Sequence, residues 1–285
     1  MTDDISIYIP VFNGEKTIID CLKSIFKQTL KPKKILIIND NSTDNTKKIL
    51  EKYLDKIEII NNEKNQGVSY SRNLAVNYLK TKYIASIDAD VMLSENWLQQ
   101  VYNSLINKNA TLVGGKLYEK YLNNPCNYWR SLRLRQNWGE IDIINPEFIF
   151  GCNNILNTTN LNLNTIYRND HEYFRLNGDD TELCKFLKKN NHILFYDSSA
   201  VCSHLQDDSY KSLASRYWRY VFYGDGLKKR NFVKTIKNIL RQMKKTTFWI
   251  IEDLIKFRFS LLKVNLFVLL YLIKIDIEHY KKNNA

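Results

Sequence analysis

The first 110 residues alternate between short apolar runs and longer segments with helical periodicity, and this alternation constrains the fold most strongly. Segments 5–9, 34–38, 57–60 and 83–87 have the composition of buried strands. Between and after them, apolar residues recur every three or four positions over 18–26, 44–54, 68–79 and 97–106, which predicts helices. Strands that alternate with helices form βαβ units. We therefore predict an α/β fold with a mixed, mostly parallel sheet that is flanked by helices.

The remainder of the chain is less regular. We expect a strand over 111–118, loops with short strands over 123–164, a helix over 181–189 and short strands over 192–196 and 200–203. Helices are predicted over 209–223, 232–259 and 261–275. This pattern predicts one domain over 1–208 and a helical extension over 209–285.

Two carboxylates lie on either side of a small residue directly after the fourth predicted strand, in the tripeptide Asp88-Ala89-Asp90. Such carboxylates repel each other, and a divalent cation held between them and a phosphate group relieves the repulsion. Most Asp-X-Asp tripeptides are solvated turns. However, open α/β sheets bind ligands at the carboxyl ends of their strands, so we predict that a cation and a diphosphate meet here.

Two other loops leave the predicted sheet at the same edge. Asp40 follows the second strand too early to cap the next helix, so we favour a ligand role for it, whereas Asp44 is expected to cap that helix. Gly67 precedes a predicted helix whose amino terminus favours anions. Arg72, one turn into that helix, is either a phosphate or base contact or a solvated surface residue.

A second acidic cluster and a histidine follow later in the chain. Asp179 and Asp180 lie at the start of a predicted helix, where they either interact with the helix dipole or supply a general base. His204 follows a short apolar strand. Histidine is a common metal ligand, so we predict that His204 supplies a nitrogen ligand to a metal held by Asp90.

Taken in order, these segments resemble glycosyltransferase family 2. The resemblance is carried by Ile-Pro-Val-Phe-Asn at 9–13, Asn-Asp-Asn-Ser-Thr-Asp at 39–44, Asn-Gln-Gly-Val-Ser-Tyr-Ser-Arg-Asn at 65–73, Asp-Ala-Asp at 88–90, Gly-Asp-Asp-Thr-Glu-Leu at 178–183 and His204. It implies a GT-A fold, in which a Rossmann-like nucleotide-binding half (1–110) and an acceptor half (111–208) share one mixed sheet. It also implies inverting transfer of a sugar from a nucleotide-diphospho-sugar, usually UDP-linked, to a hydroxyl of a glycan or lipid-linked acceptor in surface polysaccharide or glycoconjugate synthesis.

The resemblance further implies a role for each matching residue. Asp40 would bind the base, Asp88 would contact the ribose or a metal-bound water, and Arg72 would lie near the base or the phosphates. Asp90 would bind Mg²⁺ or Mn²⁺, with His204 as a further ligand. Asp180 would be the catalytic base and Asp179 would support it. The remaining nucleotide-binding residues would be Pro10, Val11, Glu15 and Ala89.

The irregular middle segment contains aromatic residues that could stack on an acceptor sugar, namely Tyr128, Trp129 and Trp138. We expect at least one of the tryptophans to pack in the core instead. Of this segment, Trp138 and Asn153 are the predicted acceptor contacts.

The chain departs from the family pattern at three places. It has Asn39-Asp40-Asn41-Ser42 where Asp-Asp-Gly-Ser is common, and Asp179 where Glu is common. It also lacks Gln-x-x-Arg-Trp, which argues against a processive polymer synthase. A nucleotidyltransferase and a non-catalytic homologue that binds nucleotide sugars are the alternatives, but the loop after the first strand has no basic residue before Lys16. No nucleic-acid-binding motif is present, so no nucleic-acid partner is expected.

Positive charge is concentrated in the predicted helical extension. Residues 206–285 hold 17 Lys and Arg against 7 Asp and Glu, which accounts for most of the net charge of +12. Segment 226–275 could therefore face an anionic membrane surface, pack on the catalytic domain or form a homodimer, and the sequence leaves these three open. Its longest apolar run, 266–273, is much shorter than the ~20 residues that span a bilayer.

The five cysteines are scattered and show no CxxC spacing, which argues against a zinc site or a disulfide framework. The chain starts with an acidic stretch that leads directly into a strand, so no signal peptide is expected. We therefore predict a cytoplasmic protein, peripheral to the membrane if the extension binds lipid.

Overall fold

The computed structural model describes residues 4–163, 166–168, 178–224 and 231–284. The chain divides into two compact units, Met1–Lys120 with Gln136–Leu205, and Tyr121–Arg135 with Gln206–Ala285. The predicted domains were continuous along the chain. In the structure, Tyr121–Arg135 leaves the first unit and packs with the C-terminal helices of the second.

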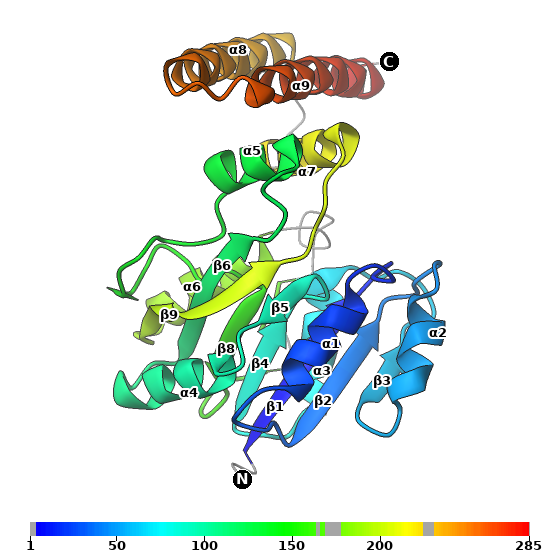
Figure 1. The fold of residues 1–285 in the computed structure, drawn as a ribbon, viewed down its shortest axis with the longest axis vertical. Helices are drawn as coiled ribbons and strands as arrows, with labels where there is room; N and C mark the ends of the chain where they lie inside the picture. The colour runs from blue at the N-terminus through cyan, green and yellow to red at the C-terminus, as the bar shows by residue number, and fades with distance from the viewer. Residues whose placement is uncertain (1–3, 164–165, 169–177, 225–230, 285) are drawn as a thin grey trace. The chain divides into compact units, whose positions relative to one another are not determined.

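The first unit is built on one mixed sheet (Figure 1), whose described strands follow the order β3-β2-β1-β4-β8-β6-β9-β5, with β7 paired to β9. Pairing is parallel among β3, β2, β1 and β4, and between β6 and β9. The remaining pairs are antiparallel, including β8 between β4 and β6. The predicted α/β fold with a mixed sheet is thus confirmed. The strands are β1 Ile5–Val11, β2 Lys34–Asn39, β3 Glu58–Asn61, β4 Tyr83–Ile87, β5 Val91–Leu93, β6 Leu112–Glu119, β7 Ile143–Ile144, β8 Asn153–Asn157 and β9 Leu194–His204.

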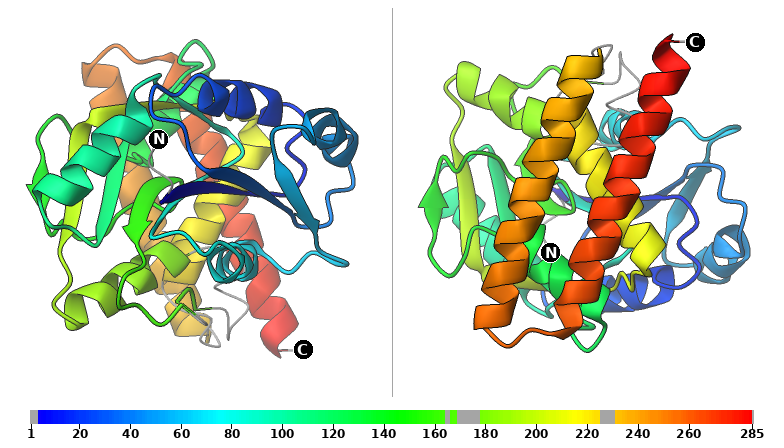
Figure 2. Two further views of the ribbon diagram at one scale, coloured as in Figure 1. Left: turned by 90° about the horizontal axis from the view of Figure 1, so that it is seen from below. Right: turned by 90° about the horizontal axis from the view of Figure 1, so that it is seen from above.

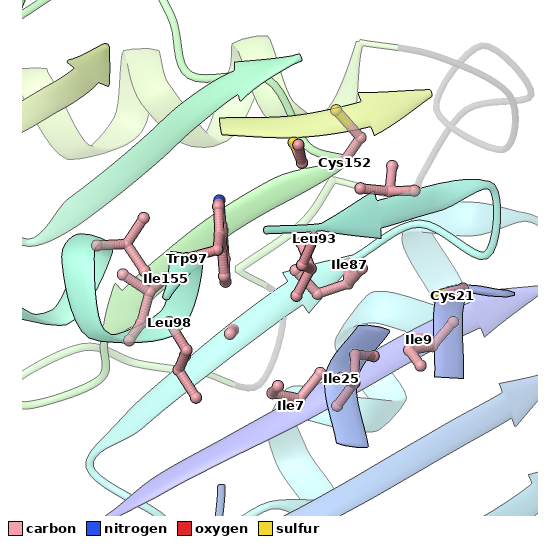
Figure 3. Packing of buried hydrophobic residues seen from close by; sticks show 14 of the residues in the cluster. Ile7, Ile9, Cys21, Ile25, Ile87, Leu93, Trp97, Leu98, Cys152 and Ile155 are labelled. Atoms are coloured by element: carbon pink, nitrogen blue, oxygen red, sulfur yellow. The ribbon is translucent and has the colours of Figure 1, made fainter. Parts of the chain in front are cut away.

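Helices cover both faces of this sheet. On one face, one hydrophobic cluster contains α1, α4 and alternate residues of β1, and α4 contacts β6, β8 and β9. Figure 3 shows Ile25 of α1, Trp97 of α4 and Ile7 of β1 in this cluster. On the other face, a second cluster contains the intervening β1 residue Tyr8, with α3 packed against β1 and β2 and α6 packed against β9. This alternation follows from the two-residue period of a strand. The helices are α1 Ile18–Phe26, α2 Thr46–Leu50, the 3₁₀ helix η1 Glu51–Tyr53, α3 Val68–Tyr78, α4 Trp97–Asn107 and α6 Asp179–Lys189.

The two short strands predicted over 192–203 form one long strand, β9. Its pairing with β6 shifts register between Gly114 and Lys116, so β9 carries extra residues at this point. Asp197 stabilises the irregularity, because its carboxylate accepts hydrogen bonds from the backbone N–H groups of Ser199 and Ala200. Polar residues in mid-strand therefore mark a bulge here and do not mark a loop.

The second unit consists of α5 Pro125–Arg133, α7 Tyr210–Gly224, α8 Phe232–Ile255 and α9 Ser260–Asn284. Trp129 of α5 is completely buried and packs edge-on against Tyr217 of α7 and Trp249 of α8. The expectation that at least one tryptophan belongs to the core is confirmed. No helix in the described part of the chain combines the length and the apolar character needed to cross a bilayer.

The prediction of loops over 123–164 missed helix α5. The helix begins with Asn124, whose side chain accepts a hydrogen bond from the backbone N–H of Cys126, and with Pro125 in its first turn. Asparagine-rich composition favours a loop, but here one asparagine, Asn124, is a helix cap. The predicted helix over 232–259 also ends early, at Ile255, and Phe257 has a positive φ of 53° before α9 begins.

Candidate active site

The loops predicted to bind a ligand do lie at one edge of the sheet. They follow β1, β2 and β4, which are parallel neighbours, so their carboxyl ends meet. Backbone hydrogen bonds connect the loops, because Asp40 N donates to Val11 O and Asp88 N donates to Cys152 O on the approach to β8. The sheet thus brings together segments that lie far apart in the chain.

Asp40 is buried at this edge and its carboxylate is extensively hydrogen-bonded. It accepts hydrogen bonds from Asn62 Nδ2 at 2.7 Å and from the backbone N–H groups of Gln66 and Gly67 at 2.8 Å. Asp40 therefore connects the loop after β2 to the start of α3. The adjacent Asn41 has a φ of 59°, a left-handed conformation that asparagine tolerates, so the loop makes this turn without the glycine common in the family.

The loops after β1 and β2 also bind each other. Glu15 N donates to Asp44 Oδ2, and Asn45 N donates to Glu15 Oε2. Asp44 also accepts a hydrogen bond from Thr46 N at the start of α2, although the N-cap residue of this helix is Asn45 and not the predicted Asp44. Of the other predicted nucleotide contacts, Val11 is buried in the core, whereas Pro10 and Ala89 are half-buried.

Arg72 is the centre of a buried ion-pair network, and the interpretation of a solvated surface arginine is wrong. Its Nη1 donates to Asp179 Oδ2 at 2.6 Å and its Nη2 donates to Asp88 Oδ1 at 3.0 Å, with only 5% of the arginine side chain exposed. Gly151 lies directly against the guanidinium, since a Cβ at this position would be 2.5 Å from Nη1. Arg72 therefore fixes both the Asp88 loop and the start of α6.

The two neighbouring aspartates at the start of α6 have different environments. Asp179 is buried against Arg72, whereas Asp180 is half-buried and accepts hydrogen bonds from the backbone N–H groups of Gly151 and Thr181. Burial, followed by repulsion from Asp179, raises the pKa of Asp180 to about 6, although Arg72 opposes the shift. Two neighbouring carboxylates in such different environments, one bound to a cation and one with a raised pKa, are typical of acid–base sites.

Asp90 and His204 are adjacent, as the sequence predicted. His204 Nε2 lies 3.2 Å from Asp90 Oδ2, and the strand register brings them together, because His204 of β9 pairs with Val91 of β5. Asp90 is about a quarter exposed and His204 is buried. Burial lowers the pKa of His204, but the two neighbouring carboxylates, Asp90 and Glu119, outweigh this and raise it to about 9.

Glu119 is a further candidate site residue, which the sequence analysis missed. Its carboxylate lies 3.1 Å from His204 Nδ1, on the opposite side of the ring from Asp90, and only 6% of its side chain is exposed. It pairs with His204 across β6 and β9. A single glutamate at the end of a strand carries no sequence signal of its own, and only the pairing of β6 with β9 would have revealed it.

The residues present fit a divalent cation that is bound jointly with a ligand. Asp90 supplies a carboxylate oxygen and His204 supplies Nε2, and a carboxylate on Nδ1 is the usual orienting partner of a metal-bound histidine. Among the described residues, no group of three or more His, Cys, Asp or Glu side chains is arranged to hold a metal. Further ligands would therefore have to come from water or phosphate oxygens, as is common for Mg²⁺.

The two predicted acceptor contacts have different positions. Trp138 is half-buried, packs against Phe148 and Phe150, and donates from Nε1 to Phe148 O. Asn153 is completely buried on β8, and its amide donates to Cys202 Sγ. A side chain that does not reach the surface is poorly placed to touch a sugar, so we assign Asn153 to the packing of the sheet.

Residues 6–176 match the family model described as Glycosyl transferase family 2. Among curated proteins, the chain is 28% identical to Glycosyltransferase GlyG of Streptococcus pneumoniae over 121 residues, which cover 41% of this chain and 40% of GlyG. It is also similar to the Escherichia coli protein named UDP-Glc:alpha-D-GlcNAc-diphosphoundecaprenol beta-1,3-glucosyltransferase WfgD. The two are 33% identical over 121 residues, which cover 42% of this chain and 47% of WfgD. The matched stretch thus spans less than half the length of either relative.

Solved structures extend the similarity to nearly the whole chain. TarS 1–349 of S. aureus superposes with a TM-score of 0.59 at 17% identity, covering 98% of this chain and 90% of TarS 1–349. The mannosyltransferase PcManGT of Pyrobaculum calidifontis, in complex with GDP-Man and Mn²⁺, gives a TM-score of 0.61 at 10% identity, covering 95% and 86%. These likenesses show the GT-A fold. Because the family model also matches more than half of the sequence, the chain belongs to glycosyl transferase family 2.

Proposed function

We propose that the protein transfers a sugar from a UDP-linked donor to a hydroxyl of a glycan or lipid-linked acceptor, with inversion at the anomeric carbon. The observation that carries this proposal is the position of Asp180, a carboxylate with a pKa of about 6 beside the ion pairs of Arg72. A general base needs a pKa near the working pH and a fixed position. Asp180 meets both requirements, because two backbone N–H groups hold its carboxylate.

In the proposed reaction, Asp180 accepts the proton of the acceptor hydroxyl. The acceptor oxygen forms a bond to the anomeric carbon from the side opposite the diphosphate, and the bond between that carbon and the diphosphate oxygen breaks. Arg72 holds both Asp179 and Asp88 in place through its two ion pairs. Mg²⁺ or Mn²⁺, held by Asp90 and His204, would act as a Lewis acid that stabilises the departing diphosphate.

The comparisons support the donor and acceptor classes. TarS structures contain UDP or UDP-GlcNAc, and GalNAc-T7 was solved with UDP and Mn²⁺. WfgD is named for a diphosphoundecaprenol-linked acceptor. All five cysteines are free and buried, which is consistent with the cytoplasmic location proposed for the reaction.

Donor binding tests the proposal directly. Asp90→Ala should weaken Mn²⁺-dependent binding of a UDP-sugar by about 100-fold or more, because a buried histidine alone is a weak site for a hard cation. Calorimetry with a panel of UDP-, GDP- and dTDP-sugars, with Mn²⁺ and with EDTA, measures the effect. The control is Asp55→Ala, at an aspartate whose side chain is 69% exposed in the same unit. Unchanged Mn²⁺-dependent binding by Asp90→Ala would refute the metal assignment.

Glu119 should affect the affinity of the site for a metal ion, although its carboxylate contacts His204 and would not bind the metal itself. Glu119→Gln retains the size of the side chain but removes the negative charge behind His204 Nδ1. Loss of such an orienting carboxylate typically weakens metal affinity 10- to 100-fold. Electron paramagnetic resonance of Mn²⁺ in the presence of UDP measures this, with exposed Glu63→Gln as the matched control. Equal Mn²⁺ affinity in both variants would show that Glu119 has only a packing role.

A further inference from the structure

The buried face of helix α8 is polar, which is the reverse of the usual arrangement in a water-soluble helix. Its buried positions recur every three to four residues and therefore form one face. The side chains on this face make hydrogen bonds within the second unit, since Asn238 binds Asp276 of α9 and Asp253 binds Arg133 of α5. The buried residues of α8 are Thr235, Asn238, Gln242, Thr246, Trp249 and Asp253.

The opposite face of α8 is apolar and exposed. Large hydrophobic side chains with 39–70% of their area exposed recur along it at helical spacing, namely Val233, Ile236, Leu240, Met243, Phe248, Ile251, Leu254 and Ile255. Figure 2 shows α9 lying antiparallel beside α8, and α9 also exposes Leu266, Phe267, Leu270 and Ile277. Monomeric proteins rarely leave so long an apolar surface in water, and such surfaces mark contacts with a partner or a membrane.

The charges among these apolar residues are almost entirely positive. In the described residues 231–281, nine Lys and Arg side chains are exposed, whereas Glu278 is the one exposed acidic side chain. Asp253 and Asp276 are buried, and Glu252 binds Arg133 and Lys256. The exposed cations are Lys234, Lys237, Arg241, Lys244, Lys245, Lys256, Lys263, Lys274 and Lys281.

We propose that the α8–α9 hairpin lies in the interface of an anionic membrane, with its apolar side chains among the acyl chains and its lysines at the lipid head groups. Long helices with an apolar face and basic residues beside it bind membranes in this way. Anionic lipid complements both features of the surface. A second copy of the chain complements only the apolar one, because a symmetric contact brings the same positive faces together.

Vesicle flotation of the full-length protein tests this proposal. We expect it to float with vesicles of phosphatidylcholine and phosphatidylglycerol at 70:30, and at least tenfold less with pure phosphatidylcholine. Leu240→Gln with Ile251→Gln should lower the partition coefficient at least tenfold, and Lys237→Gln with Lys244→Gln about 25-fold, since each lysine contributes about fivefold. The matched control is Leu54→Gln with Ile106→Gln, two exposed apolar residues of the first unit.

The substituted residues are exposed, so the variants should fold, and circular dichroism verifies this. Wild-type protein that floats with neither vesicle, or equally with both, would overturn the proposal. A second contrary outcome combines two results. Light scattering would show a wild-type dimer that the Leu240→Gln with Ile251→Gln variant no longer forms, and the wild-type protein would not float. None of these measurements depends on sugar transfer, so the result stands apart from the proposed reaction.

Discussion

Asp180→Asn is expected to lower turnover by about 10³-fold while leaving the affinity for donor nearly unchanged. An amide has the shape of the carboxylate but cannot accept the proton of the acceptor hydroxyl, and general-base contributions are about 10²- to 10⁴-fold. Single-turnover kinetics with a donor that the protein binds, together with calorimetry of that donor, separates the two effects. Asp142→Asn, at an exposed aspartate of the same unit, is the control. Wild-type turnover by Asp180→Asn would exclude this residue as the base.

The same residue predicts how activity and stability depend on pH. Because the pKa of Asp180 is about 6, kcat/KM should rise tenfold per pH unit below pH 6 and level off above it. This folded-state pKa lies above the value of about 4 in an unfolded chain, so the wild-type protein loses stability as the pH rises from 4 to 6. At pH 8, the free energy of unfolding of Asp180→Asn should therefore exceed that of wild type by up to about 2 kcal/mol, once the loss of one hydrogen bond is subtracted. Urea unfolding at pH 4 and pH 8 measures this difference.

Arg72→Met should cause the largest loss of stability, about 3–5 kcal/mol. The substitution retains the aliphatic stem but leaves Asp179 buried and Asp88 half-buried without their cation, and unpaired buried charges are costly. Urea unfolding measures the loss, with exposed Lys64→Met as the control. Asp179→Asn in the Arg72→Met background should recover part of the loss, because it removes the uncompensated charge. If Arg72→Met cost less than 1 kcal/mol, the network would have no structural role.

The sequence predicted the N-terminal half of the sheet well, because each strand there is a continuous apolar run and each helix has a regular period. β4, for example, begins and ends where the composition changes. The strand predictions that failed were those in which the limits of the strand depend on the neighbouring strands that pair with it. The predicted break at residues 197–199 lies inside β9, where the register shift against β6 and the hydrogen bonds of Asp197 accommodate it.

The same distinction holds at the candidate site. The sequence marks Asp88, Asp90, Asp180 and His204 as candidates because their motifs are local or because the family pattern includes them. Glu119 was missed because its proximity to His204 arises from pairing between strands 85 residues apart in the chain. The choice between a surface and a buried Arg72 was likewise open, since its partners come from two distant segments.

The contact between Gly151 and Arg72 also restricts how this chain can diverge. The guanidinium is held by carboxylates on two sides, so it cannot shift to make room for a methyl group at position 151. A side chain at position 151 would be tolerated only after Arg72 had been replaced. That replacement would leave the buried carboxylate of Asp179 without its cation. The two positions should therefore be epistatic, and an evolutionary path through either single change would pass through a poorly folded intermediate.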